Sequence, residues 1–300
     1  MAWRGVHLSK AAHLRIEHRN LVIEFREEAK SVARLPLEDI AYLIIDTLEI
    51  TLTASLLAAM SENEIVVIGI NDKHLPAWSS FPWGLHYRQG EVTSLQLECS
   101  LPLKKRMWQH IVEKKILAQA WALDSFGLQQ VDTLQSLASG VLSGDTNNQE
   151  ARAAVIYWGE FFAPRSFRRH DDDLPNTLLN YGYSLIRAGL ARHLCAAGFL
   201  PVLGLHHCSM NNAFNLADDL IEPYRPLVDF FAKKLLADRP SNDAFNTDDR
   251  RALTQILEAP VILSGNEMTL FASIKLVTQS LKHAIRQRDP ALLVYPHLKE

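Results

Sequence analysis

The stretch PLKKRMWQHIVEKKILAQAW, residues 102–121, marks the point at which the hydrophobic pattern of the chain changes. Apolar side chains recur in it about every 3.6 residues, at Leu103, Met107, Ile111, Leu117 and Trp121. This period predicts an amphipathic helix, and Pro102 suits its first turn because that position needs no N–H donor. The chain downstream keeps the helical period, whereas the chain upstream does not.

Downstream, further helices are predicted at about 129–139, 147–162, 174–197, 212–236, 248–258 and 268–287. Thr146 is a candidate N-cap for the helix near 147, with Asn147 and Asn148 as rivals. Gly198 suits the end of the helix before it. Residues 102–300 are therefore predicted to form an all-helical domain.

Upstream, the hydrophobic pattern has a period of two. Leu14 and Ile16 alternate with polar residues, Arg19-Asn20 offers a turn, and residues 21–25 offer the return strand. Further short apolar runs predict strands at 31–35, 41–45 and 65–68, and residues 51–60 predict a helical insertion. Strands this short bury a core by stacking two sheets, so residues 1–80 are predicted to form a β-sandwich.

The fold class predicted is therefore α+β, with a small β-sandwich domain (1–80), a linker (81–101) and a larger helical catalytic domain (102–300). The break is visible from residue 71 to residue 100, where prolines and glycines punctuate the chain around Trp78 and Trp83.

Composition excludes several classes of protein. A hydrophobic share of 48% and a charged share of 22% are typical of a globular protein and exclude collagen, coiled coil and disorder. No apolar run is long enough to span a membrane. The three cysteines are far apart and no export signal is visible, so we expect a cytoplasmic protein. The net charge of −3 argues against a globally basic DNA binder, so a polyanion would have to dock on local patches.

Three places concentrate groups able to do chemistry. Glu150 opens an apolar helix, where it could be a metal ligand or base, or could simply complement the helix dipole. His206 and His207 follow a glycine-containing loop, and either could bind a metal or be solvated. Asp219 and Glu222 share one helical face, with Arg225 one turn further along; the alternative is a solvated acidic face.

Two carboxylates and one imidazole would suit Mg²⁺ or Mn²⁺, which can activate a hydroxyl for phosphodiester chemistry. Close by in sequence, Arg165, Arg168 and Arg169 flank Phe167. This cluster could contact phosphates, or form a loop whose charge is offset by the three aspartates that follow.

The order of these places resembles the CRISPR-associated endonuclease that acts as the spacer integrase of bacterial adaptive immunity. Four motifs carry the resemblance: Glu150-Ala-Arg-Ala-Ala-x-x-Tyr157, Asn176-x-x-Leu-Asn-Tyr-x-Tyr183, Gly204-x-x-His207 and Asp219-Leu-Ile-Glu-Pro-Tyr-Arg-Pro226. Residues that look like the type II branch are Trp108, Ile111, Val112, Lys115, Ile116, Asn215 and Leu216.

The resemblance implies a site and a reaction. It makes Glu150, His207 and Glu222 the metal ligands and selects His207 over His206 by its place in the motif. It puts Asp219 beside the ion as supporting charge or as a water-mediated ligand. It implies that a free 3′-hydroxyl of a DNA fragment attacks a phosphodiester at the edge of a repeat. Arg165, Arg168, Arg169 and Arg225 are then expected to contact double-stranded DNA.

The resemblance also implies partners. We expect a homodimer formed through the β domain, a small ferredoxin-like partner protein that is itself a dimer, and involvement of the type II RNA-guided effector nuclease, with no membrane. Two alternatives are a catalytically idle DNA-binding scaffold of the same shape and an unrelated small-molecule metallohydrolase.

Overall fold

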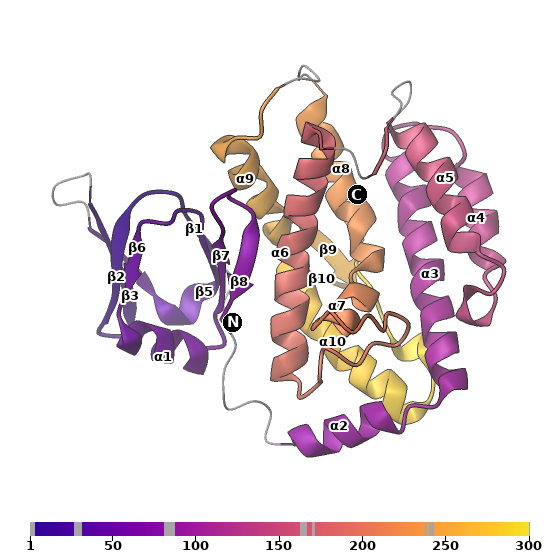
Figure 1. Cartoon of the computed structure of the whole chain (residues 1–300), viewed down its shortest axis with the longest axis horizontal. Coiled ribbons are helices and arrows are strands. Elements are labelled where there is room, and N and C mark those ends of the chain that lie inside the picture. Colours follow the sequence, from indigo (N-terminus) through magenta and orange to yellow (C-terminus); the bar gives the residue numbers. More distant parts are fainter. Residues whose placement is uncertain are drawn as a thin grey trace.

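The computed structural model describes residues 4–26, 32–80, 88–162, 167–169, 172–237, 239 and 243–299. Its strands and helices lie in two regions (Figure 1). The strands of the first region are β1 (Arg4–Leu8), β2 (Ala12–Glu17), β3 (Asn20–Phe25), β4 (Val32–Pro36), β5 (Ile40–Ile45), β6 (Ile50–Leu52), β7 (Val66–Ile70) and β8 (Pro76–Ser79). A helix, α1 (Ala54–Glu62), joins β6 to β7.

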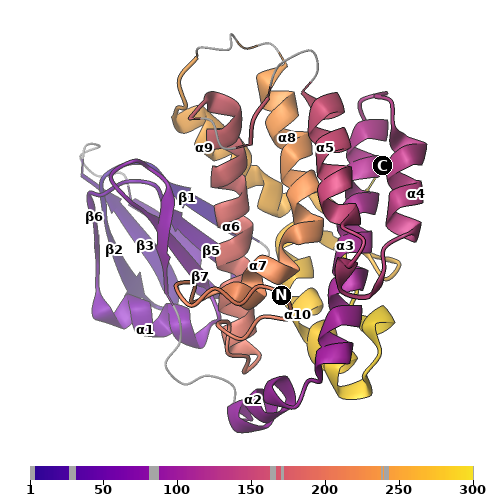
Figure 2. The same cartoon turned by 45° about the vertical axis from the view of Figure 1, so that its right-hand side comes forward.

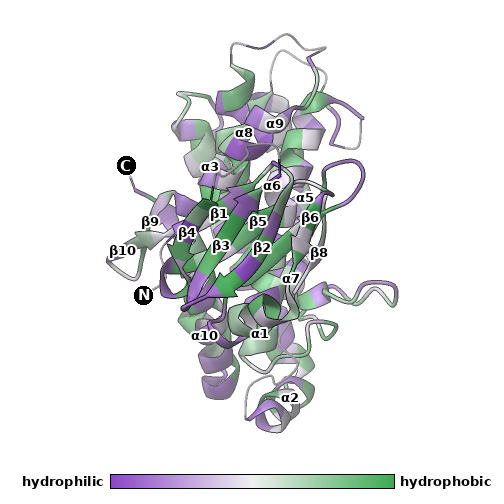
Figure 3. Cartoon of the chain, turned by 90° about the vertical axis from the view of Figure 1, so that its left-hand side faces the viewer, coloured by the Kyte–Doolittle hydropathy of each residue, from purple (hydrophilic) through white to green (hydrophobic). Residues whose placement is uncertain are grey.

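These strands form two four-stranded sheets that pack as a sandwich. The order is β1-β5-β7-β8 in one sheet and β4-β3-β2-β6 in the other. Apolar residues from both sheets share one core, to which β2 contributes Leu14 and β5 contributes Leu43 and Ile45. Figure 3 looks onto the β4-β3-β2-β6 sheet and shows hydrophobic residues concentrated in its strands. The predicted sandwich is confirmed.

The sheet that contains β5 and β7 is buried on both faces. Tyr42 and Ile44 of β5 and Val66 and Ile68 of β7 belong to the core of the helical region, whereas their neighbours in sequence face the sandwich core. This explains why both strands read as continuous apolar runs rather than as alternating ones. Tyr42 also donates a hydrogen bond to Glu258 (3.2 Å) and packs its ring against Phe271.

Three strands of this region, β1, β6 and β8, escaped prediction, and the predicted β7 stopped short of Gly69. Close packing of aromatic rings explains part of this. A Cβ on Gly5 of β1 would lie 2.1 Å from the ring of Tyr42, and a Cβ on Gly69 of β7 would lie 1.9 Å from the ring of Trp78 in β8. Glycine is therefore needed where an aromatic ring covers the strand, although glycine weakens a strand signal. Pro76 is tolerated in β8 because it is the first residue of a strand that lies at the edge of its sheet.

The second region is mainly helical. Its helices are α2 (Gln89–Leu97), α3 (Leu101–Asp124), α4 (Val131–Ser139), α5 (Gln149–Phe161), α6 (Leu174–Ala196), α7 (Asn215–Leu220), α8 (Arg225–Leu236), α9 (Thr247–Thr254) and α10 (Leu270–Gln287). Figures 1 and 2 both show α6 between the sandwich and the helices α3, α5 and α8. Among the helices of the described ranges, none combines the length and hydrophobicity needed to cross a bilayer.

Four details of the prediction are wrong. The helical region also holds a small sheet of β9 (Pro260–Leu263), β10 (Asn266–Thr269) and β11 (His297–Leu298), because Ser264 and Gly265 have the positive φ of a tight hairpin turn. α2 forms inside the expected linker. α1 begins at Ala54 rather than at residue 51, since Thr53 caps it and accepts a hydrogen bond from the backbone N–H of Leu56. In α3, Leu117 is exposed and Ile116 is buried instead.

Candidate functional site

Glu150 lies in the first turn of α5, as the sequence predicts. Of the three cap candidates, Thr146 is wrong and its rival Asn148 occupies the N-cap position, but its backbone is left-handed and its side chain makes no capping bond. Asp145 replaces it, since its carboxylate accepts the backbone N–H groups of Gln149 (2.8 Å) and Glu150 (3.1 Å). Asp145 therefore fixes where the helix starts and from where Glu150 projects.

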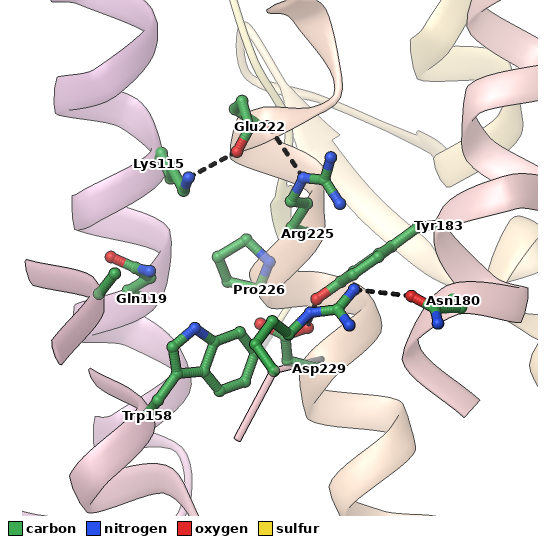
Figure 4. A pocket seen from close by; sticks show the side chains of 11 residues that line it. Lys115, Gln119, Trp158, Asn180, Tyr183, Glu222, Arg225, Pro226 and Asp229 are labelled. Carbon is green, nitrogen blue, oxygen red and sulfur yellow. Dashed lines mark hydrogen bonds and ion pairs between the residues drawn. The ribbon is translucent and has the colours of Figure 1, made fainter. Parts of the chain in front are cut away.

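Lys115 of α3 joins Glu150 to Glu222, which begins a short 3₁₀ turn (Glu222–Tyr224) between α7 and α8. Its Nζ atom lies 2.6 Å from Glu150 Oε1 and 2.6 Å from Glu222 Oε2. On the other side of Glu222, Arg225 Nε donates to Oε1 at 2.9 Å (Figure 4). Arg225, one turn further along the same face, thus pairs with Glu222.

The electrostatics of Glu222 follow from these two cations. Burial by itself raises the pKa of this carboxyl, but Lys115 and Arg225 outweigh burial and lower the pKa to about 2. Its Oε2 atom is buried and accepts no hydrogen bond of ordinary geometry from the described residues, so the ion pair with Lys115 is its main interaction. Glu222 is thus a carboxylate that requires a cation beside it.

His207 lies in the loop between α6 and α7, and Asp219 of α7 holds it. The fully buried carboxylate of Asp219 accepts the backbone N–H groups of Leu205 (2.6 Å), His206 (3.2 Å) and His207 (3.0 Å), and the ring Nδ1–H of His207 at 2.7 Å. The hydrogen bond that His207 donates to Asp219 raises the pKa of His207. A carboxylate behind the imidazole orients it and leaves Nε2 as the nitrogen that can bind a ligand.

The two adjacent histidines have different surroundings. His206 stacks flat on Trp108 of α3, with ring centroids 4.1 Å apart, whereas His207 meets the same indole edge-on at 5.6 Å. Stacking on Trp108 therefore gives His206 a structural role, and this explains one histidine of the pair.

The three predicted ligands are not arranged around one common metal-binding position. Glu150 and Glu222 converge on one ammonium group, while His207 pairs with Asp219 and feels the charge of Glu222. Among the side chains that the structure describes, no cation bridges Asp219 and Glu222, although their spacing placed them on one face. Within the ranges described, no group of three or more His, Cys, Asp or Glu side chains is arranged to hold a metal ion.

The donors nevertheless match a hard divalent cation in chemistry. Two carboxylates already flank one positive charge, and an imidazole with a carboxylate behind it lies nearby. Oxygen with one nitrogen is the donor set that Mg²⁺ and Mn²⁺ accept. Lys115 was noted in the sequence only as a branch marker, and its pairing across three segments was not readable there.

A cavity of about 540 Å³ adjoins Glu222. The side chains that line it include Lys115, Trp158, Arg169, Tyr183, Arg225 and Asp229. Arg169 is held by the side-chain oxygens of Asn176 (2.9 Å) and Asn180 (2.8 Å), and its guanidinium and that of Arg225 both lie over the ring of Tyr183. Of the predicted basic cluster, Arg169 thus reaches the cavity, Arg168 is exposed on the surface, and Arg165 lies outside the described residues.

Asp229 of α8 also lines this cavity and was not predicted. Tyr157 of α5 donates to it at 2.9 Å, and Tyr183 of α6 also donates to it. Burial raises the pKa of this carboxyl to about 7. Both tyrosines stand in the quoted motifs, but their common partner could not be read from a linear sequence.

The comparisons with known proteins agree with this fold. The model of the family "CRISPR associated protein Cas1" matches residues 6–257. A CRISPR-associated endonuclease Cas1 from Neisseria meningitidis serogroup C (strain 8013) is 36% identical over 299 residues, which is 99% of this chain and 97% of that protein.

Two solved structures share the fold at low sequence identity. A casposase bound to integration product superimposes with a TM-score of 0.75 at 18% identity, over 96% of this chain and 92% of that one. A chain of a Cas6-RT-Cas1–Cas2 complex gives a TM-score of 0.71 at 19% identity, over 99% of this chain and 36% of that one. With the match of the family model and the full-length relative, this chain belongs to the family of CRISPR-associated protein Cas1.

Proposed function

We propose that this chain is a DNA endonuclease and integrase that depends on a divalent metal and inserts DNA fragments into a CRISPR repeat array. The observation that carries the proposal is the convergence of Glu150 and Glu222, from separate segments, on a single positive charge beside a basic cavity. The relative of 36% identity is named an endonuclease, and one structure of the same fold is a casposase bound to integration product.

Each residue has a role in this proposal. Glu150, Glu222 and the Nε2 atom of His207 would hold Mg²⁺ or Mn²⁺, and Asp219 would keep His207 in the right tautomer. A divalent cation bound there would polarise a phosphoryl oxygen and favour the deprotonated form of an attacking 3′-hydroxyl.

The cavity would receive the DNA backbone. Arg169 and Arg225 present fixed positive charges there, because asparagines and the ring of Tyr183 hold their guanidinium groups. Arginine held in this way suits phosphate oxygens. Arg168 on the surface, and Arg165 nearby in sequence, would extend the contact to the duplex.

Assembly forms part of the same proposal. A Cas1–Cas2 complex stands among the structures of the same fold, which supports a small partner protein for this chain. We retain the homodimer through the sandwich, and the type II effector nuclease, as further expectations from family resemblance.

The test is integration of a labelled duplex with free 3′-hydroxyls into a supercoiled plasmid that carries the repeat, with the partner protein present. Joined product is expected with Mn²⁺ or Mg²⁺ and not with EDTA. Glu150→Gln and His207→Ala are expected to abolish joining while DNA binding, measured by fluorescence anisotropy, stays near wild type. Undiminished joining in EDTA or in both variants would contradict the proposal.

One observation favours a second candidate, the catalytically idle DNA-binding scaffold. The described residues show no ready cluster of three ligands, and Lys115 stands between two of the carboxylates. If DNA binds with normal affinity but no cation supports joining, the scaffold is the better description.

A further inference from the structure

Lys115 is placed where a metal ion would compete with it. Its ammonium is within 2.6 Å of an oxygen of each glutamate, and its side chain is only 14% exposed. An ion pair of a surface lysine contributes little to stability. A lysine buried between two carboxylates instead neutralises charges that would be costly to bury unpaired.

The charges around Glu222 are balanced as they stand. Glu150 and Glu222 carry two negative charges, and Lys115 and Arg225 carry two positive charges. A divalent cation between the same carboxylates would add two positive charges beside the ammonium, in a place where poor solvation makes like charges costly. One of the resident cations must therefore move when a divalent cation binds.

The structure identifies which cation can move. Arg225 has a planar guanidinium that Glu222 holds by a hydrogen bond and that lies over the ring of Tyr183 at 4.6 Å. Lys115 ends a flexible four-carbon stem and borders a cavity of about 540 Å³ into which its ammonium could swing.

On the basis of the proposed function, we propose that Lys115 is an exchangeable counter-ion of the metal site. It holds Glu150 and Glu222 together in the metal-free protein, and a divalent cation displaces its ammonium into the cavity. There the ammonium pairs with a phosphate of bound DNA. Metal and DNA binding are then coupled, and each strengthens the other by the same factor.

The first test measures Mn²⁺ binding by the electron paramagnetic resonance signal of free Mn²⁺, for the wild type and two variants of Lys115. Lys115→Gln removes the competing charge and is expected to bind Mn²⁺ at least about tenfold more tightly. Lys115→Arg keeps the charge and is expected to bind no more tightly than the wild type. The matched control is Lys114→Gln, which changes the neighbouring residue of α3 without touching either ion pair and is expected to leave the affinity unchanged.

A second measurement uses the wild-type chain and does not depend on how a variant folds. Acylation of Lys115 by an amine-reactive ester, followed by mass spectrometry, is expected to be slow in EDTA. It should become several-fold faster on saturation with Mn²⁺, with Lys114 as internal reference. Addition of a short duplex should slow the reaction again, because a phosphate then covers the ammonium.

The outcomes separate this inference from the proposed function. Equal Mn²⁺ affinity in wild type and Lys115→Gln, or acylation of Lys115 that is unchanged by Mn²⁺, overturns the exchange while leaving the metal site intact. Absence of Mn²⁺ binding in every variant overturns the metal site itself, and the exchange with it.

Discussion

Glu222 and Asp229 form a natural comparison, because both are buried carboxylates that line the same cavity (Figure 4). Glu222 is held by Lys115 and Arg225 and has a pKa lowered to about 2. Asp229 is held by the hydroxyls of Tyr157 and Tyr183 and has a pKa raised to about 7. Burial is common to both, so the type of partner makes the difference.

The difference distinguishes two uses of a buried carboxylate. Glu222 stays ionised and can exchange one cation for another, which a metal ligand must do. Asp229 accepts hydrogen bonds from neutral tyrosine hydroxyls and so links α5, α6 and α8, as a structural crosslink would. We therefore expect the two residues to respond in opposite ways to substitution.

The largest effect is expected on strand transfer. Glu222→Gln should lower joining into the plasmid by about 100-fold or more, because an amide is a poor ligand for a hard cation. Asp229→Asn, the matched amide substitution, should leave joining within about threefold. Equal losses in both variants would show that the two carboxylates are not functionally distinct.

Asp219 tests an intermediate case, a buried carboxylate that acts through another residue. Asp219→Asn removes the charge behind His207 and should weaken Mn²⁺ binding by about 10- to 100-fold, as measured by titration. Asp218→Asn is the control on the adjacent residue, which pairs with Arg187 instead. Unchanged Mn²⁺ affinity in Asp219→Asn would remove His207 from the ligand set.

The structural role of Asp229 can be measured as stability. Tyr157→Phe deletes a buried hydroxyl that donates to Asp229 and should lower the free energy of unfolding in urea by about 1–2 kcal/mol. Tyr295→Phe deletes a buried hydroxyl that has no partner among the described residues and should cost almost nothing. A neutral Tyr157→Phe would argue against the crosslink.

A further effect is a dependence of stability on pH. The pKa of Asp229 is about 7 in the folded chain and about 4 in the unfolded chain, so the folded chain binds more protons between these values. The contribution of this group to stability is therefore greatest below pH 4 and falls as pH rises toward 7, by up to about 1.4 kcal/mol per pH unit. The difference in unfolding free energy between wild type and Asp229→Asn should shrink over this range, and a difference that stays constant would contradict the raised pKa.

Local patterns predicted much of the fold. The alternation at Leu14 and Ile16 predicted β2, and the helical period after Pro102 predicted α3. These features depend on residues close together in the chain. The small sheet that contains β9 was missed because its strands are short and one of its pairings joins residues 261–262 to 297–298.

The site was predicted only as far as single motifs allow. The position of Glu150 in a first turn and the placement of Arg225 one turn beyond Glu222 were readable, since each depends on neighbours in sequence. The cap by Asp145 depends on a left-handed Asn148, and the bridge by Lys115 joins three segments that meet only after folding. Tertiary pairing of this kind leaves no periodic signal in a single sequence.

The sheet with two apolar faces has a consequence for how the molecule can be divided. If the chain were cut after residue 80, Tyr42, Ile44, Val66 and Ile68 would lose the helices that shield them. A bare hydrophobic face of that kind favours aggregation of the isolated fragment. The sandwich is therefore not a detachable module, and its folding depends on the helices that follow it.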